Sequence, residues 1–339
     1  MLNDGQRQIL QSLFGPPQEA HCFWGQLLGG GAAAVDLPPG SHSLLPLLLQ
    51  RYGAPAGPVG HQLSTVVRQQ RLICLWLVGQ LHRLSGGLKA VGIDVIVLKG
   101  LGEALAHPDQ PSRAFGDLDL LVPPEQMAAA AAVLEASGVH RLRAVSLYPY
   151  DPVRHAVEFR AADGRLNVDL HRRPNHLVPL SFERLNSLWS DAKPIACGRN
   201  SVLLPCLEDR IAIACAHALF YPNRVSGDSF RYLVDLLQLL RGPVVPDPAR
   251  LEWALRLDTP ALESLALIDW CRRVDGGRLP AEQPWKPVDS GANMRRFFHG
   301  LRIRNLRRAS WAITHHPIHA ASLLLRPLTL SEPRNWGSR

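Results

Sequence analysis

The stretch Phe115-Gly116-Asp117-Leu118-Asp119-Leu120-Leu121-Val122 decides the expected fold, because it has the pattern of a short strand that carries two carboxylates. Residues two apart on a strand face the same way, so Asp117 and Asp119 project together while Leu118 and Leu120 enter the core. Two carboxylates on one face repel each other and are best tolerated when a divalent cation neutralises them. Oxygen ligands favour magnesium or manganese. The sequence therefore predicts that Asp117 and Asp119 bind a metal ion.

A second carboxylate pattern lies further along the chain, in Asn167-Val168-Asp169-Leu170-His171. Strands are expected near 153–161 and 165–171, joined at Asp163-Gly164, a strong hairpin signal. Asp169 and His171 share the strand face opposite the apolar residues. A third carboxylate beside the first two would complete a two-metal site, and Asp169 can also serve as a general base. The alternative for Asp169 is a hairpin aspartate that binds local backbone amides. His171 is expected to orient Asp169, contact substrate or make a structural hydrogen bond.

Upstream, residues 93–98 are expected to form a buried strand that Lys99-Gly100 follows, with a short helix at 101–107. A glycine between strand and helix lets the backbone approach a phosphate, which a helix N-terminus attracts. Lys99 adds a compact cation there; its alternative is a lysine whose stem covers the strand end. Arg113 is expected to bind a phosphate or to offset the acidic pair.

Composition limits the function classes. The 339 residues include 37 basic and 29 acidic side chains, a net charge of +8 that is compatible with polyanionic partners. Hydrophobic residues make up 46%, enough for a buried core, and no apolar run approaches the length of a membrane span. No secretory leader is recognised, and the six cysteines stand singly. These features predict a cytoplasmic protein with reduced thiols.

The expected fold class is α/β (α+β), a mixed sheet core flanked by helices with a mainly helical C-terminal domain. The proposed domains are an N-terminal helical and loop extension at 1–62, a core at 63–180, a helical domain at 181–325 and a loose tail at 326–339. A long helix is expected at 64–90 from its apolar spacing, and an extended stretch around 194–204. Further helices are expected at 206–220, 229–241, 248–257, 261–274 and 291–310.

Two pairs of side chains on the later helices are candidate site residues. His217 and Tyr221 lie four apart and either line a nucleotide pocket or occupy a half-buried helix face. Arg231 and Asp235 are also four apart, and an ordinary helix ion pair of about 0.3–0.5 kcal/mol would explain them equally well.

The order of strand, glycine turn, short helix, Asp-x-Asp strand and later carboxylate strand resembles that of the polymerase-β-like nucleotidyltransferase superfamily. Over roughly residues 65–240, the motifs at 97–100, 116–122 and 168–171 resemble those of a bacterial group of uncharacterised nucleotidyltransferases. The resemblance implies that Asp117, Asp119 and Asp169 are metal ligands and catalytic residues. It implies nucleotide contacts at Lys99, Gly100, Arg113, Gly116, His171, His217, Arg231 and Asp235. One departure is the turn Lys99-Gly100-Leu101, which lacks the usual serine hydroxyl.

The resemblance implies transfer of a nucleoside monophosphate from a triphosphate, with ATP favoured and Mg²⁺ or Mn²⁺ as cofactor, to an acceptor hydroxyl or phosphate. Small molecules, peptides, proteins and RNA ends remain open as acceptors, and a biosynthetic tailoring role fits them. One alternative is a nucleotide-binding accessory module without turnover. Another is a basic nucleic-acid-binding protein that uses the arginine-rich segment 295–308, although few aromatics are interleaved with its arginines.

Overall fold

The computed structural model describes residues 4–15, 22, 24–25, 41–107, 113–143, 147, 155–174, 182–220, 228–258 and 261–273. The chain divides into Met1–Pro287 and Val288–Arg339, and every described residue belongs to the first unit. The predicted helix at 291–310, the arginine-rich segment 295–308 and the tail at 326–339 lie outside the described residues, as does Tyr221.

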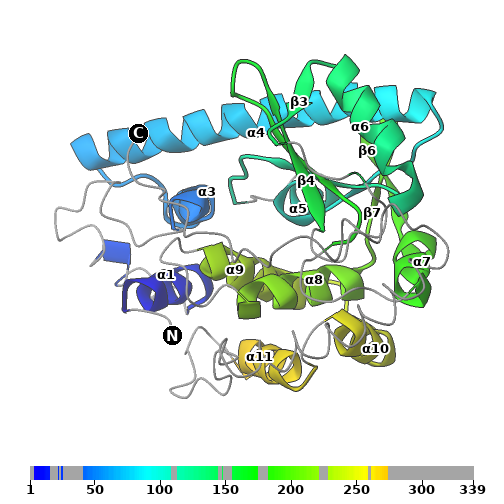
Figure 1. Cartoon of the computed structure of the whole chain (residues 1–339). Helices are drawn as coiled ribbons and strands as arrows, with labels where there is room; N and C mark the ends of the chain where they lie inside the picture. Colours follow the sequence, from blue (N-terminus) through cyan, green and yellow to red (C-terminus); the bar gives the residue numbers. More distant parts are fainter. Residues whose placement is uncertain are drawn as a thin grey trace. The chain divides into compact units, whose positions relative to one another are not determined.

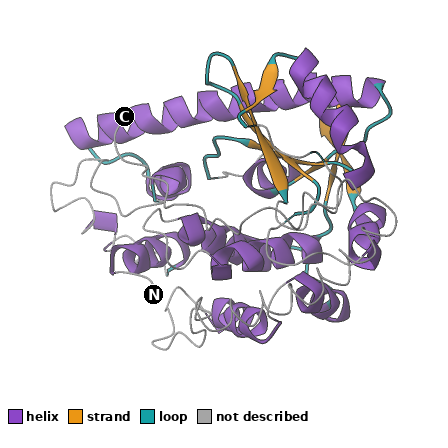
Figure 2. Ribbon diagram, in the orientation of Figure 1, coloured by secondary structure: helices purple, strands orange, loops and turns teal. Residues whose placement is uncertain are grey.

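The first unit contains a seven-stranded mixed sheet with the order β3-β4-β5-β2-β1-β7-β6 (Figures 1 and 2). The β2–β5 and β1–β7 pairs are parallel, and the other neighbours are antiparallel. The strands are β1 (Ile96–Val97), β2 (Leu118–Leu121), β3 (Val139–Arg141), β4 (Ala156–Ala161), β5 (Asn167–His171), β6 (Lys193–Cys197) and β7 (Asn200–Leu204). The mixed sheet with flanking helices confirms the expected fold class.

The predicted strands are present, but the sheet differs from the prediction in extent. A strand was expected at 93–98, and regular β1 covers only part of that segment. Backbone hydrogen bonds continue the sheet at both ends of β1: Leu203 N–H donates to Val95 O at 2.8 Å, and Leu98 N–H donates to Asp119 O at 3.0 Å. The stretch around 194–204 forms the β6–β7 hairpin, and β7 joins the sheet beside β1. The sheet therefore continues beyond residue 180. No local pattern predicted β3.

The described residues form ten α-helices, and two 3₁₀ helices at His42–Leu44 and Pro124–Gln126. The helices are α1 (Asp4–Phe14), α3 (Leu45–Tyr52), α4 (Pro58–Ala90), α5 (Lys99–Ala106), α6 (Met127–Ala136), α7 (Phe182–Asp191), α8 (Leu207–Phe220), α9 (Asp228–Leu240), α10 (Pro248–Asp258) and α11 (Ala261–Arg273). Helix α4 starts earlier than expected because Pro58 suits the first turn. Among the described helices, none combines the length and apolarity needed to span a membrane.

Two apolar cores meet along α4. Its first half places Leu63 and Val67 in a core formed with α1, α3, α8, α9 and α11, and its second half places Leu77 and Leu81 against the sheet. Figure 1 shows this helix running past both α3 and the strands. Helix α6 packs on the same sheet face as α4, whereas α7 and α8 cover the opposite face.

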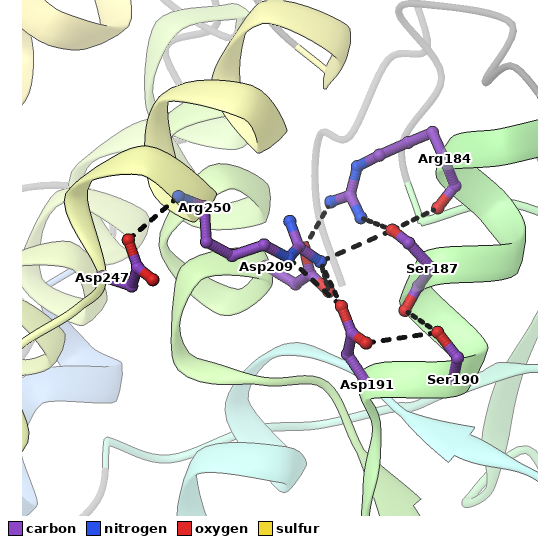
Figure 3. Close-up of polar contacts among 7 residues, drawn as sticks. All are labelled: Arg184, Ser187, Ser190, Asp191, Asp209, Asp247 and Arg250. Carbon is purple, nitrogen blue, oxygen red and sulfur yellow. Dashed lines mark hydrogen bonds and ion pairs between the residues drawn. The ribbon is translucent and has the colours of Figure 1, made fainter.

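A buried ion network fastens α7, α8 and α10 to one another (Figure 3). The Asp209 carboxylate is fully buried and accepts hydrogen bonds from Arg184 Nη2 at 2.7 Å and from Arg250 Nη2 at 2.9 Å. Arg250 also binds Asp191 Oδ2 at 3.0 Å. Both guanidinium groups lie over the ring of Trp253, at 5.5 and 4.7 Å from its centroid. The network holds the helices that cover the face of the sheet opposite α4.

Candidate active site

The parallel pairing of β2 with β5 places Asp119 directly beside Asp169. The leucines on either side of Asp119 are buried in the sheet core, so its carboxylate projects from the opposite face. One ligand atom each from Asp119, Asp169 and His171 lies within 4.8 Å of the others. The structure therefore brings together the two predicted strand motifs, from positions about fifty residues apart in the sequence.

One oxygen of Asp119 accepts two hydrogen bonds. Lys99 Nζ lies 2.5 Å from Oδ1, and His171 Nε2 lies 2.8 Å from the same atom. A carboxylate only accepts, so the proton of this second bond is on Nε2. Nδ1 of the same ring faces the carbonyl of Arg173 at 3.3 Å. Three roles were expected for His171: orienting Asp169, contacting substrate or making a structural hydrogen bond. The structure shows a hydrogen bond, and the carboxylate that accepts it belongs to Asp119.

Lys99 reaches Asp119 because of the local backbone. Leu98 N–H donates to Asp119 O at 3.0 Å, which fixes the end of β1 beside β2. Lys99 follows with φ of 56°, the one described residue other than glycine that has positive φ. Such a conformation is uncommon for a residue with a side chain and often occurs at functional sites. The turn predicted at Lys99-Gly100 is therefore present, with the lysine in the left-handed position.

Asp117 precedes β2 and is half-buried. It does not belong to the compact group of ligand atoms, but it lines a pocket beside that group. The pocket is formed by Lys99, Gly100, Leu101, Arg113, Phe115, Asp117, Asp119, Arg231 and Tyr232. Gly116 is exposed and is not among these lining residues. Six of the residues predicted to bind metal or nucleotide thus share one pocket.

The carboxylates differ in their protonation. Burial raises the pKa of Asp169 to about 6, and repulsion from Asp119 adds to this shift. Burial and the same repulsion raise the pKa of Asp117. Burial alone would also raise the pKa of Asp119, but Lys99 and His171 outweigh it and hold that pKa well below its usual range. Burial is the largest single effect on Lys99 and lowers its pKa, but Asp119, Tyr232 and Asp117 together outweigh burial and raise that pKa. Repulsion from Asp119 thus contributes, after burial, to the raised pKa values of both other carboxylates.

Arg113 is bound by a carboxylate from α9. Its Nε and Nη2 atoms donate to the two oxygens of Asp235 at 2.7 and 2.8 Å, and Nη1 donates to Ala114 O at 3.2 Å. A Cβ on Gly100 would lie 3.1 Å from this guanidinium group. The close packing of Arg113 thus favours glycine at this position. The partner of Asp235 is Arg113, 122 residues away, where the helix spacing had suggested Arg231.

Tyr232 is a pocket residue that the sequence motifs did not indicate. The guanidinium carbons of Arg113 and Arg231 lie 5.7 and 5.4 Å from its ring centroid. The ring of His217 stacks on it, with the centroids 4.6 Å apart. His217 is buried and reaches the site through this stack. An aromatic residue on an amphipathic helix is usually core, so only its position beside Arg231 could have marked it.

A mixed sheet that carries paired carboxylates beside a Lys-Gly turn has the architecture predicted for nucleotidyltransferases. The chain matches the model of a family described as uncharacterised nucleotidyltransferases over residues 41–258, from the residue before the 3₁₀ helix His42–Leu44 to the end of α10. The match covers more than half of the chain, which therefore belongs to this family.

Two solved structures are similar to the chain at low sequence identity. The antibiotic-resistance factor ANT(2'')-Ia is 12% identical, with a TM-score of 0.35, and the match covers 54% of this chain and 90% of that chain. An antigenic nucleotidyltransferase-like protein from Paracoccidioides brasiliensis is 16% identical, with a TM-score of 0.30 and coverage of 55% and 85%. A comparison with curated proteins gave no match.

Proposed function

We propose that the protein is a metal-dependent nucleotidyltransferase that moves a nucleoside monophosphate from a triphosphate, with ATP favoured, to an acceptor hydroxyl or phosphate and releases pyrophosphate. The observation that carries the proposal is the placement of Asp119 beside Asp169 on parallel strands, next to a pocket that contains Lys99 and Arg231. Membership of a nucleotidyltransferase family supports the same reaction class.

The residues of the site fit a divalent cation. Asp117, Asp119 and Asp169 offer oxygen donors, which suit Mg²⁺ or Mn²⁺. Burial is the main cause of the raised pKa values of Asp117 and Asp169, and repulsion from Asp119, which a dication would relieve, adds to it. When bound, the ion would supply positive charge for the triphosphate and for the leaving pyrophosphate. The bond from His171 Nε2 keeps Asp119 in its orientation, which suits a positioning role for the histidine.

The other pocket residues are assigned to phosphate binding and to proton acceptance. Arg113 is held by Asp235 through two of its nitrogens, and we assign the phosphate oxygens to the other two cations that line the pocket, Lys99 and Arg231. The carboxylate of Asp169, with a pKa raised to about 6, suits acceptance of the proton from an acceptor hydroxyl. The acceptor is left open by this assignment, and a biosynthetic tailoring role remains part of the proposal.

The test is pyrophosphate release from each of the four nucleoside triphosphates with Mg²⁺ or Mn²⁺ and a pool of peptide, sugar and RNA acceptors. Wild type is compared with Asp119→Asn, and Asp163→Asn is the matched control because Asp163 is exposed in the β4–β5 turn. Release by wild type and the control, but not by Asp119→Asn, is the expected result.

Calorimetry of metal-dependent triphosphate binding separates the other outcomes. Binding by the wild type without any release favours the accessory nucleotide-binding module. Absence of triphosphate binding by the wild type contradicts the proposal as a whole.

A further inference from the structure

One carboxylate oxygen of Asp119, Oδ1, is already bound by two side chains of the protein. Lys99 Nζ lies 2.5 Å from Oδ1, and the two side chains are only 11% and 6% exposed. The Nε2 atom of His171 donates to the same oxygen at 2.8 Å. A divalent ion that binds through this oxygen must compete with an ammonium group in contact with it, because both need the same lone pairs and the same negative charge.

The backbone places Lys99 in this contact. Its φ of 56° is a conformation that glycine adopts more readily, yet the glycine of the turn comes one position later and has no positive φ. The preceding Leu98 is anchored to the Asp119 backbone by a hydrogen bond of 3.0 Å. The chain therefore bears a strained lysine at the point where its ammonium meets the carboxylate, which points to a use for the ammonium.

The ammonium of Lys99 also has a second destination. Lys99 lines the pocket together with Gly100, Asp117 and Arg231. A lysine stem has four rotatable bonds, so the ammonium can turn from Asp119 to an anion in that pocket without movement of the backbone. Arg113 cannot replace it as freely, because two nitrogens of its guanidinium group are bound to Asp235.

We propose that Lys99 couples the binding of a divalent cation to the binding of the triphosphate, an inference that rests on the proposed function. Until a triphosphate arrives, the ammonium neutralises Asp119 and keeps the affinity for free Mg²⁺ or Mn²⁺ low. The phosphates attract the ammonium, and Oδ1 of Asp119 becomes available to the ion. Coupling between two ligands is reciprocal, so the ion strengthens triphosphate binding by the same factor.

The first experiment measures the Kd of Mn²⁺ alone by electron paramagnetic resonance. Lys99→Met should tighten Mn²⁺ binding about tenfold, within the range usual for coupled ligands. Lys89→Met is the matched control, because Lys89 also pairs with an aspartate, Asp94 at 2.6 Å, but both side chains are exposed; its Kd should equal that of the wild type. Lys99→Gln is the second variant if Lys99→Met fails to fold, as judged by circular dichroism.

Two further variants test whether tighter Mn²⁺ binding requires the release of Asp119 Oδ1. Arg231→Met removes a pocket cation without freeing Asp119 Oδ1, so it should tighten Mn²⁺ binding less than Lys99→Met. An equal gain from Arg231→Met would indicate a general field effect and overturn the inference. Tight Mn²⁺ binding that persists in Lys99→Met/Asp119→Asn would also overturn it, because the ion would then be bound elsewhere. An unchanged Kd in both Lys99→Met and Lys99→Gln would do the same.

The second experiment follows binding of the Mn²⁺ complex of α,β-methylene-ATP by calorimetry. Lys99→Met should weaken this binding although it strengthens binding of the free ion. If the wild type binds the complex but the lysine variants leave free Mn²⁺ binding unchanged, the inference fails and the proposed function stands. If the wild type binds neither the complex nor the free ion, the proposed function fails as well.

Discussion

Replacing Asp235 with alanine removes the carboxylate that binds Arg113 through both of its oxygens, at 2.7 and 2.8 Å. The two side chains are 5% and 6% exposed, so Arg113 would be left as a buried charge. Breaking a buried pair in this way costs about 3–5 kcal/mol of unfolding free energy. The bond from Arg113 to Ala114 O and the nearby ring of Tyr232 remain, which places the expected loss near the lower end.

The chain provides a matched control for this prediction. Arg141 Nε and Glu135 Oε1 are also 2.7 Å apart, but these side chains are 35% and 36% exposed. Glu135→Ala should therefore cost only about 0–1 kcal/mol. Replacement of both buried partners, Arg113→Met/Asp235→Leu, should recover most of the stability lost in Asp235→Ala, because no uncompensated charge remains.

The assay is urea unfolding followed by circular dichroism at low salt, with the m-value checked for constancy between variants. Equal losses in Asp235→Ala and Glu135→Ala would contradict this prediction, because burial would then not determine how much an ion pair contributes to the free energy of unfolding. A double variant as unstable as Asp235→Ala would also count against it, since packing rather than charge would then explain the loss.

Three further predictions concern single positions. Gly100→Ala should lower the unfolding free energy by about 1 kcal/mol, because the new Cβ would crowd the Arg113 guanidinium group 3.1 Å away. Gly79→Ala is the control: its Cβ meets open space, so helix propensity should raise the unfolding free energy by about the same amount. Thermal unfolding compares the two variants. The pKa of Asp169 is raised to about 6, so the free energy of unfolding of the wild type in EDTA should fall as the pH rises from about 4 to 6. Asp169→Asn should therefore be about 2–3 kcal/mol more stable than the wild type at pH 7 and equally stable at pH 4. Parallel pH profiles of the two proteins would contradict this. Asp209→Asn should cost about 3 kcal/mol in urea unfolding, because two arginines lose their buried counter-charge; a loss below 1 kcal/mol would show that the network is dispensable.

Local chemistry made several features predictable from the sequence. Alternation along a strand indicated that Asp169 and His171 share a face, because the side-chain period of a strand is fixed by its backbone. Asp163-Gly164 indicated the β4–β5 hairpin for a similar reason: Gly164 adopts φ of 72°, which glycine accepts without a steric cost. The helices from α8 to α11 also depend mainly on local spacing, and their predicted bounds lie within a few residues of the observed ones. The family motifs likewise depend on local spacing.

Contacts between distant groups depend on tertiary packing. The pairing of Asp119 with Asp169 requires the register of β2 against β5, and the pair formed by Arg113 and Asp235 joins residues 122 positions apart. The position of β7 beside β1 likewise had no local signal. Strand order, register and burial depend on how distant apolar surfaces pack, whereas turns and alternation depend on neighbouring residues. The sequence alone thus determined which carboxylates and turn could form the site, and the packing of the sheet and α9 determined that Lys99 binds Asp119 while Asp235 binds Arg113.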